Sequence, residues 1–166
     1  MAHPRVDQLR FARSEFLRGL DGLNADPGQR RLGQMNAISW IVGHLAWHEQ
    51  LSWLTRGQGI TPRPDLIELT ASGGPASTPP LEAMLAAWRE VVAAADPWLD
   101  ALTTDRLGEP IGRSQSIGTA ILRVTYHYFV HAGEVSAIRQ VVEGGRLPEF
   151  IGEIQVEAPW RAEDPG

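Results

Sequence analysis

The chain has 166 residues, a formal net charge of −5 and no cysteine, and all fifteen of its positively charged side chains are arginines. This length suffices for one domain with one core, and the lack of cysteine excludes disulfides, thiolate metal sites and a cysteine nucleophile. The negative net charge argues against nucleic-acid or anionic-membrane partners. We find no apolar run of membrane-spanning length and no signal-peptide segment, so we expect a cytoplasmic protein.

The first two predicted helices cover residues 5–23 and 37–56. Apolar side chains recur every three or four positions in both, as on the buried face of a helix. Residues 57–80 are rich in glycine and proline, so we expect a long irregular connection there, with a brief strand or turn at residues 66–69.

The third and fourth predicted helices cover residues 79–102 and 116–143. Pro97 is expected to kink or interrupt the third helix, because proline lacks the backbone N–H that a helix interior uses. Gly144 and Gly145 end the fourth helix, and residues 146–166 are predicted as a C-terminal coil.

Four amphipathic helices without strand alternation predict an all-α fold, a four-helix bundle in one domain over residues 1–166. The connection between helices 2 and 3 is too long for a tight hairpin. We therefore expect it to cross the bundle, so that the order of helices is not a simple up-down-up-down.

Histidines occur in two pairs with a spacing of four. His127 and His131 lie on the apolar stripe of the fourth helix, and His44 and His48 lie on that of the second. Residues four apart are neighbours on one helix face, and neutral imidazoles bind Zn²⁺ or Ni²⁺ well. Two ligands from one helix and one from another would leave a coordination position open. The alternative is that these are hydrogen-bonded core histidines without a metal.

Two motifs around these histidines resemble those of the DinB-like family of helical-bundle metalloenzymes. They are "HYFVHAGEVSAIRQVVEGG" in the fourth helix and "NAISWIVGHLAWHE" in the second. The resemblance implies a DinB-like bundle whose three metal ligands fall on His44, His127 and His131. His48 matches no family ligand, so we expect it to pack, to line a pocket or to shuttle protons.

Two charged residues near the histidines, Glu134 and Arg123, have two interpretations each. Glu134 lies close to the face of His131 and could bond a ligand ring or act as a general base; otherwise it is a solvated carboxylate that pairs with Arg139. Arg123, one turn before His127, could hold a substrate carboxylate or be a solvated surface residue. Glu49 is expected in solvent.

Aromatic residues near the histidines are candidates for the walls of a substrate pocket. Trp40 and Trp47 flank His44, and Tyr128 follows His127 on the inward side. A tryptophan on a helical stripe more often belongs to the core than to a binding site, and that alternative stays open here.

The resemblance implies an enzyme that uses a divalent metal and a low-molecular-weight thiol, such as bacillithiol or mycothiol, as an S-transferase or isomerase. Metal-dependent hydrolysis is an alternative within the enzyme class. A non-catalytic metal-binding stress-response protein is the alternative outside it. We expect a small-molecule substrate, no nucleic-acid or membrane partner, and a possible homodimer.

Overall fold

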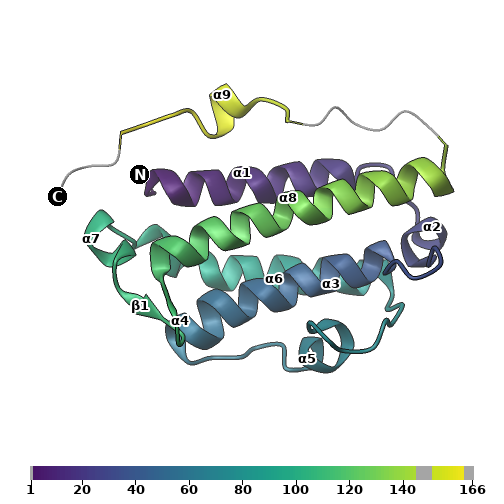
Figure 1. Cartoon of the computed structure of the whole chain (residues 1–166), viewed down its shortest axis with the longest axis horizontal. Coiled ribbons are helices and arrows are strands. Elements are labelled where there is room, and N and C mark those ends of the chain that lie inside the picture. The colour runs from purple at the N-terminus through teal and green to yellow at the C-terminus, as the bar shows by residue number, and fades with distance from the viewer. Residues whose placement is uncertain (1, 145–150, 163–166) are drawn as a thin grey trace.

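Four long helices form a bundle in the computed structural model, which describes residues 2–144 and 151–162 (Figure 1). The fold is all-α, as the sequence predicts. The long helices are α1 (Pro4–Gly19), α3 (Ile38–Glu49), α6 (Leu81–Asp100) and α8 (Ile117–Val142).

The helices pack mainly as two parallel pairs, α1 with α8 and α3 with α6. Figure 1 shows α1 and α8 running from left to right, while α3 and α6 run from right to left. Contacts at the end of the second pair agree, because the rings of Trp53 and Trp98 stack with centroids 6.1 Å apart. The connection between α3 and α6 therefore crosses the length of the bundle, which confirms the predicted crossover.

Short-range side-chain contacts fix where two of the long helices begin. His3 caps α1, because its Nδ1 accepts a hydrogen bond from the backbone N–H of Arg5. Ser116 caps α8 by accepting from the backbone N–H of Thr119 at 3.2 Å, which is the N-terminal role typical of serine. Gly144, with φ of 66°, follows the end of α8 in the left-handed conformation that glycine tolerates.

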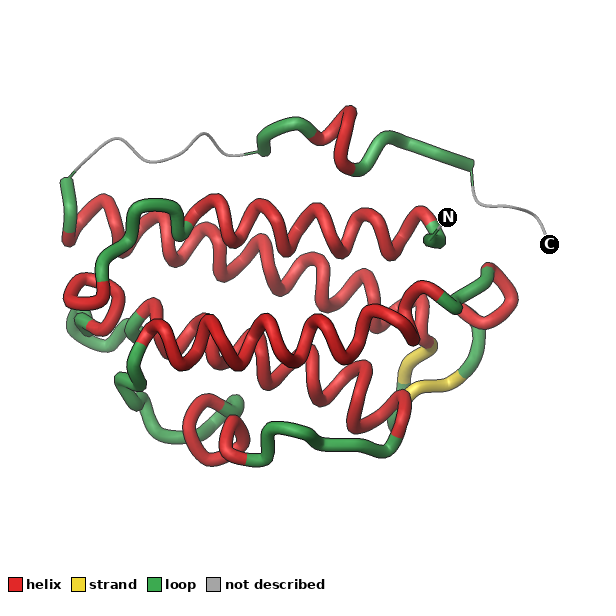
Figure 2. The backbone as a smooth tube through the Cα atoms, turned by 180° about the vertical axis from the view of Figure 1, so that it is seen from behind, coloured by secondary structure: helices red, strands yellow, loops and turns green. Residues whose placement is uncertain are grey.

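Shorter elements lie at the ends and along the outside of the bundle (Figure 1). A small antiparallel hairpin pairs Pro110 with Ser116 and lies at the end of the bundle where α3 and α6 finish (Figure 2). The predicted C-terminal coil contains one turn of helix; its residues 146–150 and 163–166 lie outside the described ranges. The short elements are α2 (Ala25–Gln29), α4 (Arg56–Gln58), α7 (Thr104–Leu107), β1 (Pro110–Ile111), β2 (Gln115–Ser116) and α9 (Ile154–Glu157).

The second predicted helix is not α-helical throughout. After α3 the chain continues as a π-helix, η1 (Gln50–Thr55), before α4. The wider π turn changes which side chains face inward, so that Trp53 and Leu54 are fully buried while Leu51 is only half-buried. A constant 3.6-residue period cannot anticipate this shift, and π turns in α-helices often occur at functional sites.

One local expectation for the middle of the chain was wrong, and another is narrowed. Residues expected as a strand or turn instead form helix α5 (Asp65–Thr70), which buries Leu66 completely and has acidic residues in its first turn. Helix α6 runs from Leu81 to Asp100 with Pro97 inside it, so Pro97 does not interrupt the helix. Packing of its apolar face against α3 outweighs the loss of one backbone hydrogen bond.

The prediction that Glu49 lies in solvent is also wrong, because its side chain is fully buried. Arg13 of α1 donates to both Glu49 oxygens at 2.7 Å, and Trp53 Nε1 and the Tyr128 hydroxyl donate to the same carboxylate. A buried carboxylate is tolerated only when it is paired and hydrogen-bonded. This network ties α1, α3 and α8 together.

No helix among the described residues is long and apolar enough for a membrane crossing. The apolar core instead fills the space between the helices. Its largest fully buried apolar side chains include Leu9, Phe16, Ile38, Ile41, Leu45, Trp53, Leu54, Leu99, Ile121 and Ile138.

Candidate metal centre

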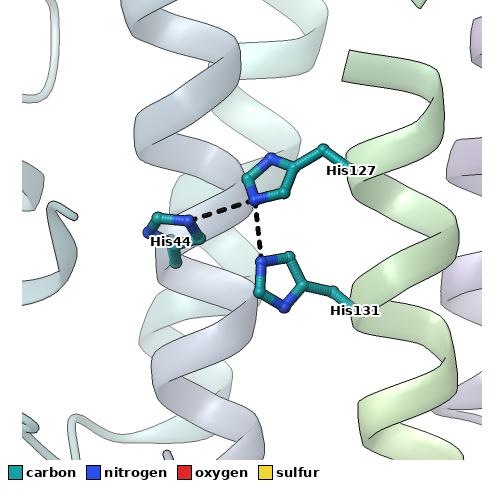
Figure 3. Close-up of side chains that lie close together, drawn as sticks. All are labelled: His44, His127 and His131. Atoms are coloured by element: carbon teal, nitrogen blue, oxygen red, sulfur yellow. Dashed lines mark hydrogen bonds between the residues drawn. The ribbon is translucent and has the colours of Figure 1, made fainter. Parts of the chain in front are cut away.

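Three histidine side chains from two helices converge between α3 and α8 (Figure 3). His127 Nε2 lies 3.3 Å from His44 Nε2 and 2.8 Å from His131 Nε2. One nitrogen from each ring lies within 4.8 Å of the others. Nitrogens bound to one tetrahedral zinc ion at the usual bond length lie about 3.3 Å apart. The spacing of the three rings therefore suits one divalent ion.

Hydrogen bonds at the outer nitrogen, Nδ1, of two of these rings determine that the inner nitrogen, Nε2, carries the free lone pair. His44 Nδ1 lies 2.9 Å from the carbonyl oxygen of Thr70, and His131 Nδ1 lies 2.5 Å from Glu134 Oε2. Carbonyl and carboxylate oxygens accept hydrogen bonds, so we assign the hydrogen to Nδ1 in both rings. Each Nε2 then presents a lone pair to the common point, as in metal-bound histidines whose other nitrogen donates to an oxygen.

His48 supports the third ring, that of His127, from outside the cluster. Its Nδ1 lies 3.1 Å from His127 Nδ1. When His127 turns the lone pair of its Nε2 inward, its Nδ1 donates to His48, and neutral His48 then carries its own hydrogen on Nε2. Each of the three converging rings thus has an outer partner.

Burial keeps these histidines neutral near pH 7. It is the main cause that lowers the pKa of His48 and His127 to about 3 and that of His131 to about 4, and charge on neighbouring histidines adds to it. Burial also lowers the pKa of His44, although its hydrogen bond to Thr70 opposes this. Neutral imidazole is the form that binds metals, so the electrostatics of the site favour ligation.

Two tryptophans hold the His44 ring from the sides. The Trp40 ring stacks on it with centroids 4.7 Å apart and an interplanar angle of 10°, and Trp47 lies at 5.4 Å. Trp40 is buried and donates from Nε1 to the carbonyl of Pro75. It therefore positions His44, and its place among the substrate-binding candidates is not supported.

An open pocket of about 360 Å³ adjoins the cluster and includes the rings of His44, His48 and His127 in its lining. Small-molecule sites in proteins have volumes of this order. Because the pocket reaches two of the three converging rings, a small molecule in it would be adjacent to an ion held there. The other lining residues are Trp47, Leu51, Arg56, Ser72, Ser114, Gln115 and Arg123.

The remaining sequence-predicted site residues fall in different places. Trp47 and Arg123 line the pocket, whereas Tyr128 does not. Tyr128 is fully buried, donates to Glu49 and accepts from Trp88 Nε1 at 2.7 Å. Tyr128 therefore lies in the core and not in the lining of this pocket.

Sequence reasoning missed two contributors to the site. The carbonyl of Thr70 lies at the end of α5, where helix carbonyls lack intrahelical partners, but a backbone contact leaves no signal in the sequence. Arg56 follows the π-helix and lines the pocket. Its position depends on the π turn, which the 3.6-residue period does not predict.

Comparison with protein families places the chain in a known superfamily. The model of the DinB superfamily matches residues 8–135, which include all three converging histidines, His48 and Glu134. No curated protein matches the sequence.

Proposed function

Because this chain belongs to the DinB superfamily, we propose that it is a metal-dependent enzyme in which His44, His127 and His131 hold a divalent ion, zinc or nickel. The observation that carries this proposal is the pair of outer hydrogen bonds, to Thr70 and Glu134, which direct two Nε2 lone pairs at the third ring. A divalent ion bound there would lower the pKa of a coordinated thiol or water and polarise a substrate oxygen.

An enzyme is favoured over a structural metal site because the nearest candidates for a fourth ligand are engaged elsewhere. Glu134 bonds His131 Nδ1, and His48 bonds His127 Nδ1. A coordination position open to a pocket is typical of catalytic sites, whereas structural sites are closed by protein ligands. The non-catalytic, stress-response alternative would require one of these side chains to leave its partner.

Within the enzyme class we propose an S-transferase or isomerase that uses a low-molecular-weight thiol, bacillithiol or mycothiol. The resemblance of the two histidine motifs supports this choice, and the chain has no cysteine of its own to supply the thiol. Trp47 and Leu51 give the pocket an apolar wall for the carbon skeleton of a substrate. Metal-dependent hydrolysis in the same pocket is the alternative.

The metal assignment is tested by elemental analysis of the purified chain and its histidine variants. We expect stoichiometric metal in the wild type and its loss in His44→Ala and His131→Ala. His3→Asn is the matched control, because it changes a histidine outside the cluster and retains a side chain that can cap α1. Stoichiometric metal in both alanine variants would refute the three-histidine assignment.

The thiol assignment is tested by thermal unfolding of the metal-loaded protein with bacillithiol, mycothiol, coenzyme A and glutathione. A ligand that binds the native state raises its apparent stability, so we expect a higher melting temperature with one thiol and no such rise in His44→Ala. A metal-loaded protein that no thiol stabilises would exclude the transferase and favour the hydrolase. Sedimentation of the same sample tests the proposed homodimer.

A further inference from the structure

The lining of the pocket carries positive charge beside its histidines. Two of its lining residues are arginines, Arg56 and Arg123, and three more are neutral polar residues, Ser72, Ser114 and Gln115. No carboxylate is among the described residues that line it. In a chain with a net charge of −5, this pocket is a local exception.

Both arginine side chains are positioned by the β1–β2 hairpin. Arg123 lies on α8 one turn before His127, and its Nε donates to Gln115 Oε1 at 3.0 Å. Arg56 packs over the hairpin turn, where an added Cβ on Gly112 would lie 3.1 Å from Arg56 Cδ. Contacts with the hairpin therefore hold two arginines from different helices in the lining of one pocket.

Neither arginine forms an ion pair with a carboxylate among the residues that the structure describes. Arg13 and Arg63, in contrast, each bond two carboxylates.

We infer that Arg56 and Arg123 bind the carboxylate of an acidic small molecule whose other end reaches the three-histidine centre. Guanidinium groups bind carboxylates through two parallel N–H donors, and Ser72 and Ser114 line the same pocket. This inference rests on the proposed function for the role of the histidines. It adds the chemical class of the ligand, a carboxylic acid with a metal-directed group such as a thiol.

Two thiols that differ in charge test the inference on the cobalt-substituted protein. Mercaptosuccinate carries carboxylates and 2-mercaptoethanol carries none, and the visible absorption of cobalt reports coordination of either. Since a hydrogen bond to a charged group contributes roughly a factor of ten in affinity, we expect mercaptosuccinate to bind at least about tenfold more tightly. Arg56→Gln and Arg123→Gln should each remove most of that preference while binding of 2-mercaptoethanol stays unchanged.

Arg113→Gln is the matched control, because Arg113 belongs to the same hairpin but does not line this pocket. It makes the same change in net charge, so an equal loss in this variant would show a general field effect and overturn the inference. Equal affinity of the wild type for the two thiols would also overturn it, while leaving the proposed thiol chemistry intact.

Failure of both thiols to bind would instead refute the proposed thiol chemistry. The arginines are then tested by calorimetry with succinate and its uncharged diamide, which need no thiol. Binding of succinate alone, lost in Arg56→Gln and Arg123→Gln, would support the inference. No discrimination between succinate and the diamide would refute it.

Discussion

Replacing Glu134 with glutamine isolates the hydrogen bond that orients the His131 ring. The substitution keeps an oxygen acceptor near Nδ1 but removes the negative charge, and charge-assisted hydrogen bonds are roughly twice as strong as neutral ones. Partners of metal-binding histidines typically change metal affinity by about 10- to 100-fold. The Glu134 side chain is 47% exposed, so water can take over part of its role. We therefore expect a loss of zinc affinity near the lower end of this range, about tenfold.

Competition with a chromophoric chelator at neutral pH measures the zinc affinity of wild type and Glu134→Gln. The matched control is Glu143→Gln at the C-terminal cap of the same helix; the Glu143 carboxylate pairs with Arg139 at 2.9 Å and does not belong to the histidine cluster. We expect wild-type affinity for the control. Equal affinities for all three proteins would refute the argument that Glu134 sets the tautomer of His131.

Three further predictions concern the surroundings of the site. Gly43→Ala should destabilise the fold by about 1–3 kcal/mol in urea unfolding, because the added alanine Cβ would lie 2.6 Å from Met84 Sδ and 2.7 Å from Thr70 Cγ2. A more stable variant, which is the usual effect of replacing glycine with alanine in a helix, would contradict this. Glu49→Gln should lower the free energy of unfolding by about 3–5 kcal/mol in the same assay, because it leaves the buried Arg13 guanidinium without its main charged partner. A decrease of less than about 1 kcal/mol would refute this prediction. As the pH falls below about 7, the metal-free protein should lose stability, because the four site histidines gain protons near pH 6.5 in the unfolded chain but resist them when folded. The loss should continue until the pH reaches the folded-state pKa values of about 3 to 4, and a urea midpoint that does not change with pH would contradict this.

The sequence predicted the bundle because its long helices bury one face each. Apolar residues at helical spacing mark such a face directly, and the length of the glycine- and proline-rich connection implied a crossover. The π-helix η1 and helix α5 were not predictable in this way. Each depends on packing against parts of the chain that are distant in sequence, such as Trp53 against Trp98.

The convergence of the site histidines was predictable because a spacing of four places His127 and His131 on one face. Their outer partners were only partly predictable. Glu134 lies one turn from His131 and was identified, whereas the carbonyl of Thr70 comes from a helix that the sequence did not predict. Arg56 was missed because the direction of its side chain depends on the π turn that precedes it, which the sequence pattern does not predict.

The histidine cluster and the buried Glu49 network share the interface between α3 and α8, and this shared position explains how the site is held in shape. Glu49 directly follows His48, and Tyr128 directly follows His127. The 2.8 Å hydrogen bond from the Tyr128 hydroxyl to Glu49 Oε1 therefore fixes the register of the two helices beside the site. Because the Arg13 guanidinium neutralises Glu49 within the core, this register does not depend on a bound ion. Side chains that are locked by packing and by supporting hydrogen bonds keep the geometry of a site. The polar core would therefore hold the three rings in position for the proposed ion, while the hairpin and the crossover contribute residues to the pocket lining.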